Sequence, residues 1–506
     1  MHQKPFNWFS IAVCLIVLYA VGLHLFLGWK IWGSDLADAD APAHFTSGVM
    51  VLDYLRHGPL LHPLAFAESF YNRFPKVAIG HWPPVYYALQ ALWYFVFGPT
   101  VAASRFLSIV ITFAASLVLF RRVRALHGAS VGALCAACFL CLPLVQVHSW
   151  LVMSDLLVGL FMFLAAMSFS DFLDSPKPAH AIWFIAWSVL AILTKGSAWS
   201  LGIFALAAPL VARKFDCFFR PWYWIAGILI VLLSAPFFLI TAALHIGYPS
   251  DPVGLASGSV SMVTRLQIVL PFAGAVPLSI FIAGLAGLGL GLRNGLRTIE
   301  AVALTLIFAQ LVFLFVLPLT EETRYYTPTF ACILLFVARS MTATTQRFVP
   351  VLIAVGCLIA CGLFEPARID GYRAVIDSIP YQPDPVTILI GSDSSGEGAL
   401  IAARLERDRA RAGLLLRGSK VLAHSNWAGS TYSLVFRQVA EVHRYLHSVP
   451  VRYIVIDSAA ARSPHLELLD SAMRSAPEIF SLRGRFPISG ARTGEALVYE
   501  NRQPGR

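Results

Sequence analysis

Three carboxylates, Asp35, Asp38 and Asp40, follow the first long apolar run of the chain, Phe9 to Leu27. Carboxylates just outside a membrane face are costly unless they have a role. Other ionisable residues stand at the ends of later apolar runs, namely Asp155, Lys195 and Arg324. A carboxylate can take a proton from a hydroxyl, and Lys or Arg can hold a phosphate. Brought together in one leaflet, these residue types suit a reaction on a lipid-linked phosphate.

The composition is that of a polytopic membrane protein. Of the 506 residues, 58% are hydrophobic and 13% are charged, whereas soluble domains have roughly 45–50% and about 25%. Basic residues in membrane proteins mainly fix orientation, so the net charge of +10 gives no reason to expect a nucleic-acid partner, and we predict none. The eight cysteines all precede Phe364, mostly inside apolar runs, and we interpret them as packing residues.

The polarity of the chain changes near Phe364, which predicts two domains. Residues 1–364 are a series of apolar runs and should form a transmembrane domain, whereas residues 365–506 are mixed and Arg-rich and should form a small α/β domain. Short apolar segments in the second part predict strands, and longer amphipathic segments predict helices. The expected strands are Val386–Ile390, Leu414–Leu416, Tyr453–Ile456 and Ala496–Tyr499, and the expected helices are Glu397–Arg409 and Val435–Leu446.

About eleven apolar segments approach the roughly 20 residues that a spanning helix needs. Two shorter segments, Phe45–Leu55 and Tyr86–Phe97, lie in an aromatic-rich loop and should be juxtamembrane helices in the interface. With this choice most basic clusters fall on one side, which the positive-inside rule makes cytoplasmic. The expected spans are Trp8–Leu27, Ala103–Leu119, Val131–Val147, Leu156–Phe172, Ala181–Leu193, Ala198–Val211, Trp224–Leu244, Ile268–Leu290, Ala301–Leu319, Thr327–Val337 and Val349–Phe364.

The same topology collects the ionisable residues on the outer side. Asp155 begins a span at that face, Lys195 lies in the turn between two spans, and Arg324 begins a later span. The loop His245–Gln267 should be external, and an odd number of spans carries the C-terminal domain outward as well. The positional argument therefore predicts one outer site with both signs of charge.

Short motifs occur along the first two thirds of the chain in a characteristic order. They are Asp38-Ala39-Asp40, Trp82-Pro83-Pro84-Val85-Tyr86-Tyr87, Ala103-Ser104-Arg105-Phe106, Ser154-Asp155, Thr194-Lys195-Gly196 and Arg324-Tyr325-Tyr326. In this order they resemble the GT-C superfamily of glycosyltransferases. Within it, the chain looks like the bacterial protein-mannosyltransferase-like branch that includes the lipid A aminoarabinose transferases.

The resemblance implies an inverting transferase of the bacterial inner membrane, multi-pass, with a periplasmic C-terminal domain. It would move a sugar from a polyprenyl-phosphate donor to a lipid, glycan or protein acceptor on the periplasmic face. The first-loop acid maps best onto Asp40, with Asp38 its partner, and the second acid onto Asp155. Lys195 and Arg324 would hold the donor phosphate. The further substrate contacts that we expect are His44, His81, Tyr86, Tyr87 and Tyr325.

Two departures from the family pattern leave questions open. Asp40 is followed by Ala41, and His44 takes the place of an aromatic residue, so either Asp38 or Asp40 could be the base. His81 and Trp82 stand where a Lys often precedes the two prolines. An Asp-x-Asp pair could also ligate a divalent cation. A monophosphate held by Lys and Arg does not require one, and we predict no obligatory metal or cofactor.

The candidates also have structural interpretations. Asp155 could cap its helix, Lys195 could be a snorkelling lysine, and Arg324 could pair with Glu321 or Glu322. The first-loop acids could be solvated, which we favour for Asp35 alone as a loop or cap residue. Two other classes compete with an enzyme: a transporter or flippase, and a non-catalytic envelope-assembly scaffold. A transporter favours paired halves with polar residues at the midplane, and the sequence shows neither.

Overall fold

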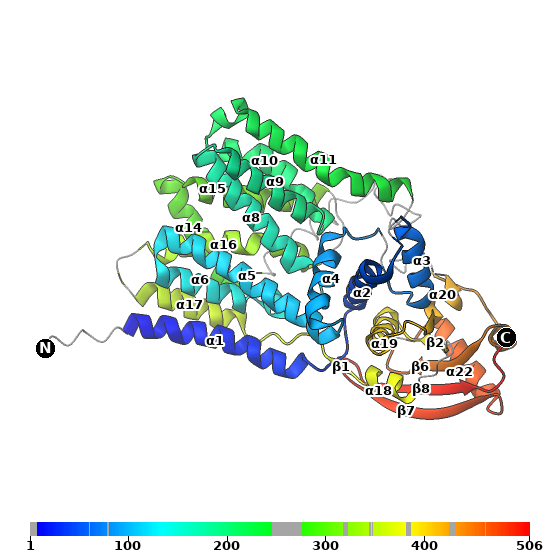
Figure 1. Cartoon of the computed structure of the whole chain (residues 1–506). Helices are drawn as coiled ribbons and strands as arrows, with labels where there is room; N and C mark the ends of the chain where they lie inside the picture. The colour runs from blue at the N-terminus through cyan, green and yellow to red at the C-terminus, as the bar shows by residue number, and fades with distance from the viewer. Residues whose placement is uncertain are drawn as a thin grey trace.

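The computed structural model describes residues 8–59, 61–77, 80–244, 276–316, 322–343, 346, 348–380, 386–424, 432–460 and 462–505. Long apolar helices lie side by side in one part of the molecule, and a sheet with its own helices lies at one end of this bundle (Figure 1). The predicted loop His245–Gln267 and the residues Glu321 and Ile268 lie outside the described residues.

Among the described residues, five helices are long and apolar enough to cross a membrane. They are α1 (Trp8–Ile31), α5 (Val101–His127), α8 (Asp155–Asp174), α11 (Pro221–Ala243) and α15 (Thr298–Val316). Shorter helices pack between and beside them: α6 (Ala129–Cys141), α9 (Pro178–Ile192), α10 (Ser200–Val211), α14 (Leu278–Asn294), α16 (Phe330–Met341) and α17 (Phe348–Cys361). The multi-pass helical class is confirmed, whereas the number of eleven spans stays a prediction.

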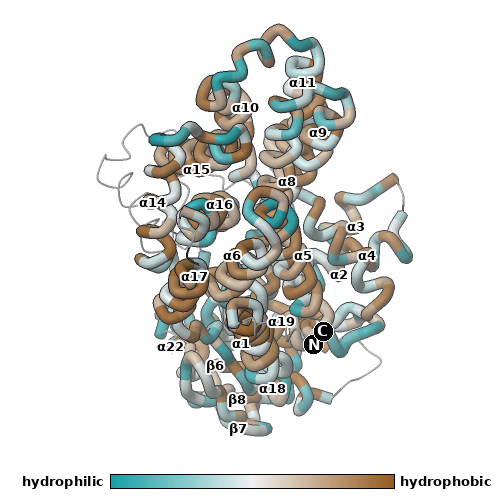
Figure 2. Tube along the Cα trace, turned by 90° about the vertical axis from the view of Figure 1, so that its left-hand side faces the viewer, coloured by the Kyte–Doolittle hydropathy of each residue, from teal (hydrophilic) through white to brown (hydrophobic). Residues whose placement is uncertain are grey.

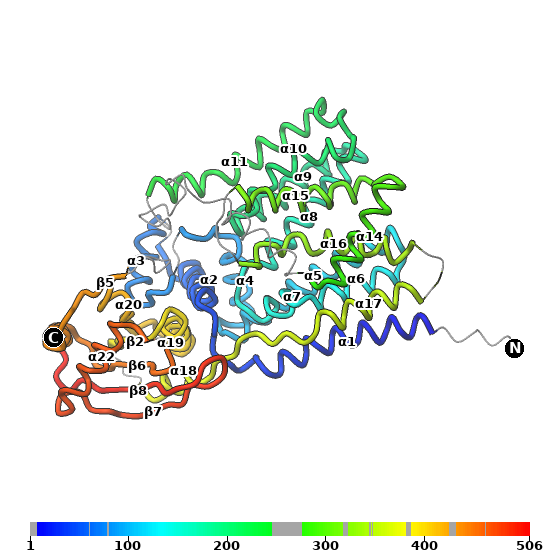
Figure 3. The backbone as a smooth tube through the Cα atoms, turned by 180° about the vertical axis from the view of Figure 1, so that it is seen from behind, coloured from blue at the N-terminus to red at the C-terminus, as the bar shows by residue number. Residues whose placement is uncertain are grey.

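The bundle helices expose large apolar side chains, among them Leu18 of α1, Leu232 of α11 and Ile359 of α17, which suits a surface that faces lipid. Hydrophobic residues run along the bundle helices when they are viewed from the side that Figure 2 presents. Seen from behind, α17 lies beside α1, so the last helix of the bundle returns to the first (Figure 3). This return places the start of the sheet domain next to Asp35, which follows α1.

Several predicted helix bounds were wrong, each for a local reason. Helix α5 continues through the basic cluster Arg121–Arg124, because nothing in that sequence breaks a helix. The predicted span Val131–Val147 is divided at Pro143, which begins the short helix α7 (Pro143–His148). Arg324 lies in a separate 3-10 helix, η3 (Thr323–Thr329), and precedes α16 instead of beginning it.

Three helices lie between the bundle and the sheet domain: α2 (Ala41–His57), α3 (Pro63–Arg73) and α4 (Val85–Phe97). The helices expected at Phe45–Leu55 and Tyr86–Phe97 are present as α2 and α4, whereas α3 was not predicted. Prolines stand in the first turns of α2 and α3, where a missing amide hydrogen costs nothing.

The C-terminal part is an α/β domain, as predicted. Its six-stranded sheet has the order β1-β7-β8-β6-β2-β3, in which β3, β2 and β6 are parallel and the others antiparallel. The strands are β1 (Ile369–Asp370), β2 (Thr387–Gly391), β3 (Leu414–Arg417), β6 (Val451–Asp457), β7 (Phe480–Gly490) and β8 (Gly494–Asn501), and a separate pair is β4 (Ala423–His424) with β5 (Ser433–Leu434). The helices are α18 (Tyr372–Ser378), α19 (Ser394–Arg407), α20 (Gly418–Val421), α21 (Val439–Ser448) and α22 (Pro464–Ser475).

The juxtamembrane helices and the sheet domain share one hydrophobic core. Phe45 of α2 and Phe70 of α3 belong to the same buried cluster as Ile388 of β2 and Ile401 of α19. Burial of this kind stabilises by roughly 25 cal/mol per Å² of apolar surface. The segment from α2 to α4 is therefore held by the C-terminal sheet domain as well as by the bundle.

Candidate active site

The acidic pair of the first loop lies at the start of α2. Asp38 Oδ1 accepts hydrogen bonds from the backbone amides of Asp40, at 2.7 Å, and Ala41, at 3.3 Å. This carboxylate therefore satisfies amides that a helix start leaves without partners. Asp40 is the N-cap residue itself, but its side chain makes no capping bond, and its carboxylate is free to face another element.

The partner of Asp40 is Arg324. Arg324 Nη2 donates to Asp40 Oδ2 at 2.9 Å, and the same guanidinium forms an ion pair with Glu322. Its Nη1 also lies 3.6 Å from the sulfur of Met153, just before α8. The predicted pairing with Glu322 is thus present, yet the guanidinium simultaneously reaches the acid of the first loop, 284 residues away in sequence.

A second ion pair lies deeper. Lys195 Nζ donates to Asp155 Oδ1 at 2.6 Å, with side-chain exposures of 9% and 2%. The other oxygen of Asp155 is buried with no hydrogen-bond partner among the described residues. Tyr325 joins the two pairs, because its ring lies 4.4 Å from Lys195 Nζ and 6.0 Å from the Arg324 guanidinium. The structure therefore brings together five residues from four distant parts of the sequence.

An aromatic layer borders these pairs. The buried ring of His44 stacks on Trp82, with the ring centroids 4.1 Å apart. Its Nδ1 lies 2.9 Å from the Tyr87 hydroxyl. Tyr86 contacts the same imidazole edge-on at 5.5 Å, and His81 contacts Trp82 at 4.9 Å. Burial lowers the pKa of His44 to about 3, against the opposing effect of Asp40. The imidazole is therefore uncharged at neutral pH.

Asp35 lies apart from this cluster. Its carboxylate accepts from the Tyr372 amide at 2.8 Å and lies 3.6 Å from Arg373 Nε, while its own amide donates to Ile369 at 2.8 Å. The loop interpretation of Asp35 is therefore incomplete, since this residue ties the end of α1 to the sheet domain.

Three residues near the site received no role from the sequence. Arg105 is buried in α5 and donates to the carbonyls of Ile31, Ser34 and other residues of the turn after α1. Lys76 is 5% exposed, donates to the Ser394 carbonyl at 3.0 Å and lies in electrostatic range of Asp40. His148 is buried in electrostatic range of Asp155. Of these three residues, Arg105 alone lies within one of the sequence motifs, Ala103-Ser104-Arg105-Phe106.

The candidate active site offers few ligands for a metal cation. Within the described part of the chain, no group of three His, Cys, Asp or Glu residues lies close enough to hold a metal ion. Asp38 is engaged with backbone amides, and Asp40 with Arg324. Independence from metal stays a prediction.

One family matches part of the chain. Residues 81–240 match the dolichyl-phosphate-mannose-protein mannosyltransferase family, which is less than half of the sequence. The match includes the Pro-Pro motif, Asp155 and Lys195. No curated protein sequence matches the chain.

Solved structures match almost the whole chain. ArnT from Cupriavidus metallidurans bound to undecaprenyl phosphate superposes with a TM-score of 0.58 at 13% identity, covering 98% of each chain. The archaeal oligosaccharyltransferase AglB from Archaeoglobus fulgidus, in complex with an inhibitory peptide and a dolichol-phosphate, gives a TM-score of 0.55 at 11% identity, covering 96% of this chain and 74% of the other. Together with the family match, they confirm the predicted resemblance to GT-C glycosyltransferases, and the low identities show it as a likeness of fold.

Proposed function

We propose that this protein is an inverting glycosyltransferase that moves a sugar from a polyprenyl-phosphate donor to an envelope acceptor at the periplasmic face. The observation that carries the proposal is the joined set of ion pairs, Asp40 with Arg324 and Lys195 with Asp155, held around Tyr325. Undecaprenyl phosphate in ArnT and dolichol-phosphate in AglB support a lipid-linked donor.

Asp40 is the better candidate for the base. Asp38 is occupied by two backbone amides, whereas the hydrogen bond of the Asp40 carboxylate within the described residues comes from Arg324, a side chain that the donor phosphate can attract. A guanidinium group can bind a phosphate as well as a carboxylate, and it can hold a phosphate through two parallel hydrogen bonds. When the donor phosphate takes this guanidinium, Asp40 loses its partner and becomes a stronger proton acceptor.

The reaction then follows from the positions of these groups. Asp40 takes the proton of the acceptor hydroxyl while the hydroxyl oxygen bonds to the anomeric carbon. The bond from that carbon to the phosphate oxygen breaks, and its electron pair leaves with the polyprenyl phosphate. Lys195 and Arg324 stabilise the charge that develops on the leaving phosphate. Attack from the face opposite the phosphate inverts the anomeric configuration. Asp155 orients Lys195.

Two experiments test this function. Lipid and glycan mass spectra of a deletion strain should lack one sugar-sized mass that the parent carries, and the wild-type gene should restore it. The Asp40→Asn variant should lower the transfer rate by about 10²–10⁴-fold, the usual contribution of a general base. Asp38→Ala should cost mainly about 1 kcal/mol of stability through the loss of its capping bonds. Equal transfer by the wild type and Asp40→Asn would exclude the assignment of the base.

A further inference from the structure

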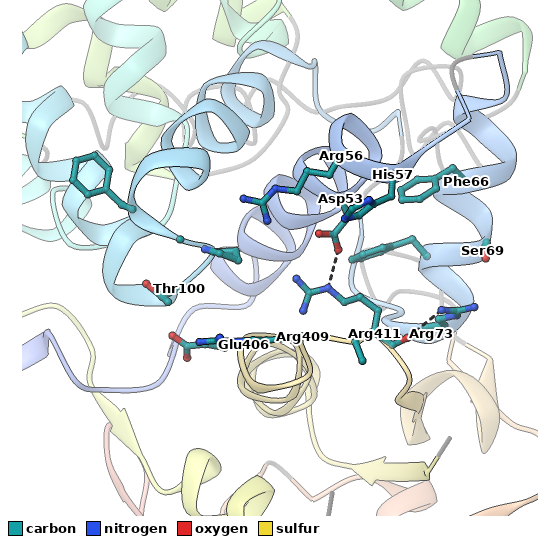
Figure 4. A pocket seen from close by; sticks show the side chains of 15 residues that line it. Asp53, Arg56, His57, Phe66, Ser69, Arg73, Thr100, Glu406, Arg409 and Arg411 are labelled. Carbon is teal, nitrogen blue, oxygen red and sulfur yellow. Dashed lines mark hydrogen bonds and ion pairs between the residues drawn. The ribbon is translucent and has the colours of Figure 1, made fainter. Parts of the chain in front are cut away.

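A cavity separate from the candidate active site lies at the junction between helices α2 and α3 and the sheet domain. It has a volume of about 840 Å³ and lies between α2, α3, the turn before α5 and the segment that follows α19 (Figure 4). Its walls combine aromatic rings, Phe66, Phe70 and Phe97, with several charged side chains. We call it the arginine pocket, after Arg56, Arg73, Arg409 and Arg411.

The carboxylates of the arginine pocket already have partners. Asp53 accepts from Arg411 Nε at 2.7 Å, a contact that Figure 4 draws between α2 and the segment after α19. Glu406 pairs with Arg373 at 3.1 Å and accepts from the Val101 amide at 3.1 Å. Neither acid is therefore available to neutralise the other cations of the pocket.

Three guanidinium groups remain without a carboxylate. Within the described residues, Arg56, Arg73 and Arg409 form no ion pair. Arg56 stacks on Phe95 at 5.0 Å, and Arg73 donates to the Arg411 carbonyl at 3.1 Å. Arg56 extends from α2 toward the turn that contains Thr100, above Arg409 on the opposite wall (Figure 4). The pocket therefore carries excess positive charge on three separate elements.

We infer that the arginine pocket binds a phosphate-bearing sugar of the acceptor. Guanidinium groups match phosphate oxygens bidentately, and aromatic faces suit the apolar face of a sugar ring. The inference rests on the proposed function and adds a substrate class to it. Asp53 lies thirteen residues beyond Asp40 along α2, or about 20 Å at the rise of an α-helix. A ligand that occupies both places is an extended anionic glycan or glycolipid head group.

Binding is measured on the full-length protein in phosphatidylcholine nanodiscs, with glucose 6-phosphate as the titrated probe. Glucose 6-phosphate should bind, and glucose should not. The combined variant Arg56→Gln/Arg73→Gln/Arg409→Gln should weaken binding of the probe at least tenfold. A matched control removes three exposed arginines elsewhere, Arg444→Gln/Arg462→Gln/Arg502→Gln, and should bind as the wild type does. Equal binding by the two triple variants, or equal binding of glucose, overturns the inference.

A second arm separates an acceptor sugar from the head groups of the bilayer. Replacing phosphatidylcholine by phosphatidylglycerol should change the affinity for glucose 6-phosphate less than threefold. A tenfold loss assigns the pocket to bilayer phospholipid and overturns the acceptor assignment. Asp40→Asn should bind the probe normally, because binding does not use the base. A failure of the transferase proposal thus appears in the transfer assay alone, and a failure of the arginine pocket appears in the titration.

Discussion

The candidate active site and the arginine pocket both use α2, but they differ in charge balance. At the start of α2, Asp40 faces Arg324, which also pairs with Glu322, and nearby Asp155 faces Lys195, so each of these cations has at least one carboxylate. Beyond Asp53, the pocket holds three arginines that no carboxylate neutralises among the described residues. The same two residue types are thus arranged for two different tasks.

The balance decides how each region can receive an anion. Under the proposed function, a phosphate that enters the candidate active site has to take a cation away from its carboxylate, and this exchange releases the carboxylate as a base. In the arginine pocket a phosphate meets guanidinium groups that need no prior exchange. On this view, phosphate binding is coupled to the reaction in the candidate active site, whereas the arginine pocket only positions its ligand.

The largest effect should come from breaking the deeper pair of the active site. Lys195→Met leaves Asp155 buried without its cation, and removal of one partner of a buried ion pair costs about 3–5 kcal/mol. We expect a corresponding loss of stability in thermal unfolding of the detergent-solubilised protein, together with loss of transfer.

The double variant Asp155→Asn/Lys195→Met tests the reason for that loss. It removes both charges, so it should regain most of the stability while transfer remains absent. If the double variant unfolds as easily as Lys195→Met, charge balance is not what stabilises this part of the site.

The sequence could predict where these ionisable residues lie, because a membrane confines them to its faces. Apolar runs and basic clusters set the topology, and this was enough to place Asp40, Asp155, Lys195 and Arg324 on one side. The pairing of specific acids with specific cations could not be predicted, since it depends on the rotation of each helix about its axis.

The junction with the sheet domain was less predictable. Phe45 and Phe70 have the apolar pattern of interfacial helices, and nothing in that pattern indicates that they bury against Ile401, over 300 positions later. Strand β7 was missed because it is largely exposed and contains Pro487 and two glycines, which are depleted in strands. The arginine pocket lies between the interfacial helices and the end of α19, and it therefore became visible only in the fold.

A smaller effect should follow from removing the ring that links the two pairs. Tyr325→Leu loses the cation–π contacts with Lys195 and Arg324, which we expect to contribute about 0.5–2 kcal/mol in total, because the Arg324 contact lies at the distance limit of this interaction. We expect transfer to fall about 2- to 30-fold in initial-rate measurements. Tyr325→Phe keeps the ring face and should stay within about twofold of the wild type. A similar loss in both variants would instead point to the hydroxyl.

A last effect, on stability and not on transfer, concerns the tie between α1 and the sheet domain. Burial raises the pKa of Asp35 to about 6 from an ordinary value of 3.8, so the folded protein favours the protonated acid. The stability that this preference contributes is complete below about pH 4 and is lost as the pH rises through about 6. The slope is at most about 1.4 kcal/mol per pH unit.

Asp35→Asn should remove this pH dependence while an amide oxygen still accepts from Tyr372. The difference between the unfolding temperatures of variant and wild type should therefore grow from pH 4 to pH 7 and then stay constant, at fixed ionic strength. Lys76 does not confuse the result. Burial lowers its pKa to about 7, so its contribution is present at alkaline pH and is lost as the pH falls through about 7. It is common to both proteins and cancels in the difference. Parallel pH profiles would mean that Asp35 is ionised in the folded protein and that the ion pair with Arg373 outweighs its burial.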